Sequence, residues 1–178
     1  MSSQERSKIR PWTMYDLEAV QRVLLETWLD AYSSFIPRSD LESYFENHYN
    51  LDALTKLMAT EGVDGLLAEV NGEVVGFART TYDKAESRFT VTSLYVLPQH
   101  QGEGLGQQLL ESAERIAARH GADSVWLGVM EQNTRALEWY QRIGFTFVEV
   151  APFVMGSTTV PHLIGYRPLK PETLGPAP

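Results

Sequence analysis

Hydrophobic positions follow helical spacing in the first third of the chain. One amphipathic helix is predicted from four apolar residues that lie three or four positions apart, Leu17, Val20, Leu24 and Trp28. Thr13, just before them, has the character of an N-cap followed by an acidic first turn. We expect a short strand over residues 9–12, and two more helices over residues 39–49 and 54–58 after the break at Pro37.

The pattern then changes to that of β-strands. Residues 65–70 and 73–79 flank Asn71-Gly72, a pair typical of a type I′ hairpin turn. The next predicted strand covers residues 89–96, and its apolar positions are odd-numbered in the first half and even-numbered in the second. A shift of one residue predicts a β-bulge, which leaves backbone N–H and C=O groups free to hold a ligand.

Helices and strands alternate over the rest of the chain. They are predicted as a glycine-rich turn at 98–106, a helix ending near Gly121, a strand at 125–129, a helix between Asn133 and Gly144, and strands at 145–150 and 160–166. This order predicts an α/β (α+β) fold with a mixed, mostly antiparallel central sheet, one bulged strand and flanking helices. We assign residues 1–170 to a single domain and residues 171–178, with three prolines, to a disordered tail.

Composition narrows the classes of function. The 178 residues carry a net charge of −8, which disfavours nucleic-acid binding. No apolar run reaches the length of a membrane span, and the polar start of the chain is unlike a secretory signal, so we expect a cytoplasmic protein without a membrane partner. No metal site is predicted, because there is no cysteine and the four histidines lack metal-ligand spacing.

The central motif is the loop Gln99-His-Gln-Gly-Glu-Gly-Leu-Gly106 between a strand and a helix. Glycines let a ligand approach the backbone, and the first N–H groups of a helix attract phosphate. A Walker loop is excluded because the chain has no Gly-Lys pair, and Gln107 stands where a dinucleotide fingerprint needs its third glycine. The loop therefore predicts a pyrophosphate site, with a plain glycine turn as the alternative.

Two blocks resemble the GNAT superfamily of N-acetyltransferases. Leu94-Tyr-Val-Leu-Pro98, followed by Gln99-x-x-Gly102-x-Gly104, is similar to the family's pyrophosphate signature. Asn133-x-x-Ala136-x-x-x-Tyr140-x-x-x-Gly144-Phe145 is similar to the block that follows it, in the same order and spacing. The resemblance implies a GNAT-like fold and acetyl-CoA as co-substrate.

It also implies roles for individual positions. The backbone of the bulged strand would bind the pantetheine arm, the loop amides would hold the pyrophosphate, Asn133 would bind the pantetheine or phosphate portion, and Tyr140 would stand at the thioester sulfur as the catalytic residue. The implied cofactor-binding residues are Leu94, Tyr95, Val96, Gln101, Gly102, Glu103, Gly104, Leu105, Gly106, Gln107, Asn133 and Tyr140. A core tyrosine whose hydroxyl bonds to backbone is the structural alternative for Tyr140.

The acceptor should contact the first half of the chain. Aromatic and acidic residues on the early helices, Trp28 and Tyr32 among them, loosely resemble bacterial spermidine/spermine acetyltransferases and suit a polyamine. Another small amine, an antibiotic, a peptide N-terminus and a non-catalytic acetyl-CoA sensor remain alternatives. Asp83, Glu86 and Glu131 are candidate bases, because Thr90 and Thr92 stand where many relatives carry carboxylates. The base, the physiological acceptor and the oligomeric state, with a homodimer as one option, stay open.

Overall fold

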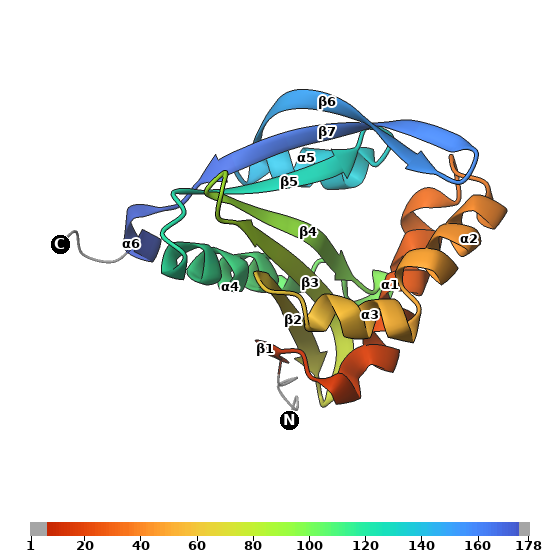
Figure 1. The fold of residues 1–178 in the computed structure, drawn as a ribbon, viewed down its shortest axis with the longest axis horizontal. Coiled ribbons are helices and arrows are strands. Elements are labelled where there is room, and N and C mark those ends of the chain that lie inside the picture. Colours follow the sequence, from red (N-terminus) through yellow and green to blue (C-terminus); the bar gives the residue numbers. More distant parts are fainter. Residues whose placement is uncertain (1–6, 175–178) are drawn as a thin grey trace.

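A computed structural model describes residues 7–174, which form a seven-stranded sheet (Figure 1). In sheet order the strands are β1 (Ser7–Pro11), β2 (Val63–Val70), β3 (Glu73–Asp83), β4 (Arg88–Val96), β5 (Ser124–Met130), β7 (Thr158–Pro168) and β6 (Thr146–Met155). All neighbouring strands pair antiparallel except β4 and β5, which are parallel. The expected mixed, mostly antiparallel sheet is therefore confirmed.

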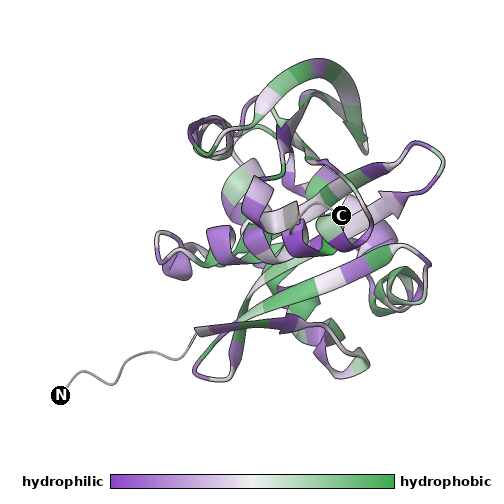
Figure 2. Cartoon of the chain, turned by 90° about the vertical axis from the view of Figure 1, so that its left-hand side faces the viewer, coloured by the Kyte–Doolittle hydropathy of each residue, from purple (hydrophilic) through white to green (hydrophobic). Residues whose placement is uncertain are grey.

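Helices cover the sheet, as the alternating pattern predicted. Those of the first third are α1 (Leu17–Tyr32), α2 (Arg38–His48) and α3 (Leu51–Met58), and those of the second half are α4 (Leu105–Arg119) and α5 (Thr134–Arg142). Gly76 of β3 faces Leu109 of α4, whereas the next residue, Phe77, contacts Trp12 just before α1. Because successive strand residues point to opposite faces, α4 and α1 lie on opposite sides of the sheet. Hydrophobic segments concentrate where strands and helices meet (Figure 2).

The predicted hairpin and bulge are both present. Asn71 and Gly72 have φ values of 52° and 88°, the left-handed pair that a type I′ turn requires. On β4, Thr92 is the extra residue, because Arg79 of β3 pairs with Ser93 and Thr80 pairs with Val91. The bulge falls between the two phases of the apolar pattern, so the shift in that pattern has a direct structural cause.

The bulge also separates β4 from β5. The two strands pair only where residues 89–91 face residues 125–127. Beyond this point they diverge, and the opening faces α1 and α2 (Figure 1). A bulge bends its strand and increases the local twist. It therefore turns β4 away from β5 and leaves two strand edges, residues 92–96 and 128–130, on either side of a gap.

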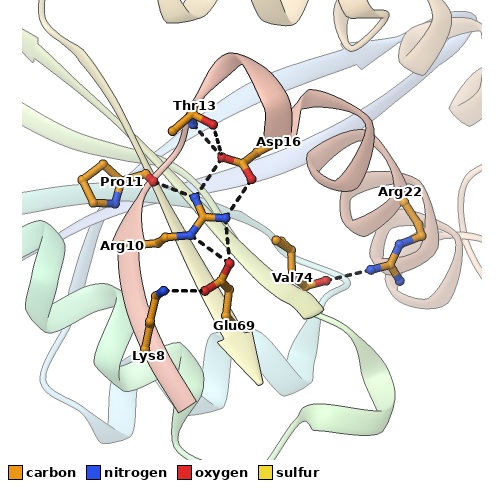
Figure 3. Close-up of polar contacts among 8 residues, drawn as sticks. All are labelled: Lys8, Arg10, Pro11, Thr13, Asp16, Arg22, Glu69 and Val74. Carbon is orange, nitrogen blue, oxygen red and sulfur yellow. Dashed lines mark hydrogen bonds and ion pairs between the residues drawn. The ribbon is translucent and has the colours of Figure 1, made fainter. Parts of the chain in front are cut away.

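A charged network around Arg10 fastens β1 to the sheet (Figure 3). The guanidinium donates to both carboxylate oxygens of Asp16 and to Oε1 of Glu69, each at 2.8 Å. Asp16 also accepts the Thr13 N–H and hydroxyl, both at 2.7 Å, which closes the turn η1 (Met14–Asp16) that leads into α1. The hydrogen bonds from Arg10 hold the pKa of Asp16 well below its usual range. Asp16 therefore links strand, turn and helix.

Replacing Asp16 with asparagine should destabilise the fold by roughly 1.5–3 kcal/mol at neutral pH, the usual worth of hydrogen bonds to a charged group. Because the folded pKa is depressed, this stabilisation is present above the unfolded value of about 4 and is lost as pH falls further. Denaturant unfolding at a series of pH values tests both points. The control is Glu61→Gln, whose ion pair with Lys84 is exposed and screened by solvent, so this variant should change the stability far less than D16N does. Equal stabilities of D16N and wild type at neutral pH would contradict the assigned role.

The C-terminal end of the described residues packs against α4. Pro171–Leu174 form a short helix, α6, that contacts α4, so the predicted disordered tail is corrected for these four residues. Buried Leu169 holds this end through its N–H, which donates to the Asp123 carbonyl at 2.8 Å. Residues 175–178 lie outside the described residues. Within residues 7–174, no helix has the length and hydropathy of a membrane span.

The outer strand β6 carries an exposed apolar row. Val148, Val150 and Val154 are 57–64% exposed on this edge strand, which arches over the top of the molecule in Figures 1 and 2. An exposed apolar edge is a surface on which a second chain can pair. The homodimer nevertheless stays a prediction, which the molecular mass in solution would test.

Candidate active site

The gap between β4 and β5 opens into a cleft of about 1050 Å³. One half is lined by the glycine loop, the start of α4 and the helix α5. The other half is lined by α1, α2, β6 and β7. We call these the cofactor half and the acceptor half. The exposed strand edges of β4 and β5 lie between them, so a molecule in either half can reach the same backbone groups.

The glycine loop has the conformation that close approach of a ligand requires. Gly102 and Gly104 have φ values of +87° and +79°, and a Cβ atom on either would meet nothing within 4 Å. The left-handed backbone therefore faces open space rather than packed protein. Gly104 is the N-cap of α4, and the N–H groups of the first helical turn have no partner within the helix. Gln101 anchors the loop, because its side-chain amide donates to the Val96 carbonyl at 2.9 Å.

The structure brings nearly all the predicted cofactor residues together. Only Glu103 is absent from the cleft wall, since its carboxylate turns to His100 Nδ1 at 3.2 Å. The others line the cleft: Leu94, Tyr95, Val96, Gln101, Gly102, Gly104, Leu105, Gly106, Gln107, Asn133 and Tyr140.

Asn133 has partners within the fold as well as a place in the cleft. Its Oδ1 accepts the Ala136 N–H at 3.4 Å and caps α5, as predicted. Its side chain also lies beside Tyr32, which in turn lies beside Tyr95. These three side chains therefore meet where α5, α1 and β4 approach one another in the cleft.

Tyr140 lies in the wall of the cleft. The residue is 7% exposed, and its ring contacts Trp139 and Phe145. No hydrogen bond of its hydroxyl is found among the described residues, so the alternative of a hydroxyl bonded to backbone finds no support. Burial, and then the nearby Tyr32, raise the pKa of Tyr140 well above its ordinary value of 10. Tyr140 is therefore a protonated donor throughout the physiological pH range.

Aromatic side chains wall the acceptor half. Trp28 is its centre, with the rings of Tyr32, Tyr44 and Tyr49 at 5.3–5.4 Å and that of Tyr95 at 6.3 Å. Trp28 and Tyr32, the predicted acceptor residues, both line the cleft and are both buried. They therefore belong to the core and to the cleft wall at once.

Charged groups in the acceptor half are mostly positive. The Arg79 guanidinium lies 5.9 Å from the Tyr49 ring and donates from Nε to Thr92 Oγ1 at 2.9 Å. Arg88 lies 4.0 Å over the Trp126 ring. Within residues 7–174 neither arginine has a carboxylate partner, and Asp30 is the one carboxylate that lines the cleft.

The predicted candidate bases do not line the cleft. Asp83 and Glu86 are exposed in the turn between β3 and β4, where Asp83 accepts backbone N–H groups, and Glu131 is exposed just after β5. His120 stacks on Tyr82 at the far end of α4. His100 does line the cleft, beside the glycine loop. Among the described residues no group of three acidic or histidine side chains converges as a metal site.

Sequence reasoning missed several residues of the acceptor half. They are Tyr49, Arg79, Arg88, Gly128 and His162. One signal was available, because His162, Ile164 and Tyr166 alternate along β7 and alternating residues share a face. The position of these β7 residues opposite α1 depends on the order of strands in the sheet, and no local sequence pattern shows that order.

Fold and site together define a class of protein. Two parallel strands separate at a bulge, and a glycine loop and the start of a helix lie at one side of the gap. This arrangement forms a site for an elongated, phosphate-bearing cofactor and leaves room for a second substrate. Such a site suits group transfer from a coenzyme A thioester, because strand edges can bind the pantetheine amides and helix N–H groups the pyrophosphate.

Comparison with known proteins agrees with this class. The acetyltransferase (GNAT) family matches residues 22–145. An uncharacterised N-acetyltransferase of Lactobacillus delbrueckii subsp. lactis is 29% identical over 147 residues, which are 79% of this chain and 85% of the relative. The streptothricin acetyltransferase of Streptomyces lavendulae is 35% identical over 96 residues, 54% of this chain and 47% of that protein.

A solved structure is similar over its full length. The PaiA N-acetyltransferase of Thermoplasma acidophilum, crystallised with coenzyme A, superposes with a TM-score of 0.79 at 22% identity, covering 92% of this chain and 99% of that one. The chain belongs to the GNAT family of acetyltransferases, and it is an N-acetyltransferase that uses acetyl-CoA.

Proposed function

We propose that the chain transfers the acetyl group to the primary amine of a small molecule that enters the acceptor half of the cleft. The observation that carries this proposal is the shape of the cleft. Its two halves meet at the strand edges, and Tyr140 lines the same cleft, so a thioester from one half and an amine from the other can reach a common point.

Each predicted cofactor residue keeps a role in the proposal. The backbone of residues 94–96 pairs with the pantetheine arm as an added strand and polarises the acetyl carbonyl. Backbone amides of residues 101–107 hold the pyrophosphate, each hydrogen bond to this charged group being worth roughly 1.5–3 kcal/mol. Asn133 contacts the pantetheine portion while it caps α5, and Tyr140 faces the sulfur.

The charged side chains of the acceptor half indicate which charge the acceptor should carry. A polyamine would need several carboxylates, but the wall offers Asp30 alone, and α1 exposes it to solvent. Two arginines without carboxylate partners, Arg79 and Arg88, repel a polycation and attract an anionic group. Flat aromatic walls favour a planar or apolar body. The wall therefore supports an amine with a neutral or anionic body better than it supports spermidine.

An amine-bearing antibiotic is a second candidate. The segment shared with streptothricin acetyltransferase supports it, although that segment spans about half of the relative. The volume of the cleft would admit a molecule larger than a simple alkyl amine.

A panel of acceptors tests the proposal. Thiol release from acetyl-CoA is measured with spermidine, a neutral alkyl amine and an ω-amino carboxylate of similar length, and streptothricin. We expect kcat/KM for the carboxylate-bearing or neutral amine to exceed that for spermidine, with the advantage of the carboxylate shrinking as salt screens the arginines. A clear preference for spermidine that weakens with salt would overturn this view of the acceptor and restore the polyamine hypothesis.

A further inference from the structure

His162 lines the acceptor half of the cleft, where its ring packs against a glycine. It lies on β7 opposite Met130 of β5, and its ring packs over Gly128. A Cβ atom at Gly128 would lie 2.4 Å from Cε1, 2.8 Å from Nε2 and 2.9 Å from Nδ1 of that ring. Only glycine leaves room for the imidazole here. Phe153 of β6 contacts the ring with centroids 5.2 Å apart.

The surroundings keep His162 neutral. Burial lowers its pKa from the ordinary value, and a hydrogen bond to the Gly128 backbone opposes this effect. No charged side chain contributes to the shift. The packed neighbours from β5 and β6 are the uncharged Gly128, Met130, Ala151 and Phe153. A neutral imidazole carries a lone pair on one ring nitrogen, and this nitrogen can accept a proton at neutral pH.

The other titratable groups of the acceptor half suit proton acceptance less well. Burial raises the pKa values of Tyr32, Tyr44 and Tyr95, which therefore remain protonated. Asp30 is exposed, and Arg79 and Arg88 cannot accept a proton. On β4, the lining residues Thr90 and Thr92 carry hydroxyl groups, which are not bases at neutral pH. His162 is thus the neutral base of this wall, and it adjoins the free edge of β5.

We propose that His162 is the general base of acetyl transfer, a role that rests on the proposed function. The amine nitrogen attacks the thioester carbonyl, forming the C–N bond while the carbonyl π electrons move to oxygen. The nitrogen becomes more acidic once bonded to carbon, and its proton passes to the free nitrogen of His162. Collapse re-forms the carbonyl and breaks the C–S bond, and the thiolate, stabilised by the Tyr140 hydroxyl, receives its proton from water. The imidazolium returns its proton to solvent, so the enzyme is regenerated.

The test compares His162→Gln with wild type in single turnover at saturating acetyl-CoA and acceptor, across a range of pH. Wild type should show an acid limb with an apparent pKa below about 6.5, because the base must be neutral. H162Q should lose that limb and react roughly 10²–10⁴-fold more slowly, with acetyl-CoA affinity unchanged. Added imidazole should restore part of the rate of His162→Ala. The matched control is His48→Gln. His48 lies outside the cleft wall, with its ring centroid 4.1 Å from that of Tyr44, and the variant should behave as wild type.

The outcomes separate the two proposals. A wild type that releases no thiol with any amine rejects the proposed function itself. An active wild type whose H162Q variant keeps its rate within threefold, and keeps the acid limb, rejects the base alone. In a third outcome, H162Q is slow but keeps the acid limb, and imidazole does not restore the rate of H162A. This outcome would assign His162 a packing role and would also overturn the proposal.

Discussion

Replacing Tyr140 with phenylalanine should lower the single-turnover rate of acetyl transfer by roughly 10²–10⁴-fold, the range for a positioned proton donor. The residue is buried and lines the cleft, and its hydroxyl makes no hydrogen bond to another described residue. A free thiol titrates near 8.5 and tyrosine near 10, so complete proton transfer would be uphill by about 2 kcal/mol or more. Because burial raises the pKa of Tyr140 further, the hydroxyl should stabilise the thiolate by hydrogen bonding rather than by giving up its proton.

Acetyl-CoA affinity should change little in Y140F, since a thioester sulfur is a poor acceptor in the ground state. Single-turnover rates are needed, because a slow product release would hide the loss in kcat. Tyr82→Phe is the control, as its ring lies by His120, away from the cleft. A rate for Y140F within threefold of wild type would make Tyr140 structural.

Replacing Gly104 with valine should weaken acetyl-CoA binding by at least about 100-fold, the equivalent of one or two hydrogen bonds to a charged group. A valine Cβ would project into the open space beside the loop, where the pyrophosphate is expected. The φ of +79° also strains a β-branched residue, at a cost of roughly 1–3 kcal/mol. Isothermal calorimetry measures the affinity, and thermal unfolding measures the strain.

The control lies at the other end of the same helix. Gly121 has a φ of +76°, and a Cβ there would likewise meet nothing within 4 Å. Gly121→Val should therefore carry a similar strain and leave the affinity for acetyl-CoA unchanged. If G104V bound acetyl-CoA as tightly as G121V, the loop would not be the pyrophosphate site.

The cofactor half could be predicted because its signals are local. A strand, a glycine loop and a helix start follow one another within residues 89–106, and the phase shift of the strand marks the bulge at Thr92. The helix that carries Tyr140 is capped by Asn133, a residue with a strong capping preference. Short-range backbone requirements thus fix both the elements and the residues that they present.

The acceptor half could not be predicted in the same way. Its wall combines Trp28 of α1, Arg79 of β3 and His162 of β7, which only the sheet order brings together. The excess of acids on the early helices suggested a cationic acceptor, but most of those carboxylates lie outside the cleft wall. Periodicity places a residue on a face of its own element and does not show which element covers that face.

The central claim is that the cleft joins acetyl-CoA to an amine and catalyses transfer between them. The most direct measurement follows one turnover of purified protein with acetyl-CoA and a reactive primary amine, recording free thiol and N-acetylated product together. The two should appear in equal amounts and at the same rate, faster than in a reaction without protein. Acetyl-CoA binding in calorimetry with no thiol released for any amine in the panel would contradict the claim, and would identify the chain as a sensor of acetyl-CoA.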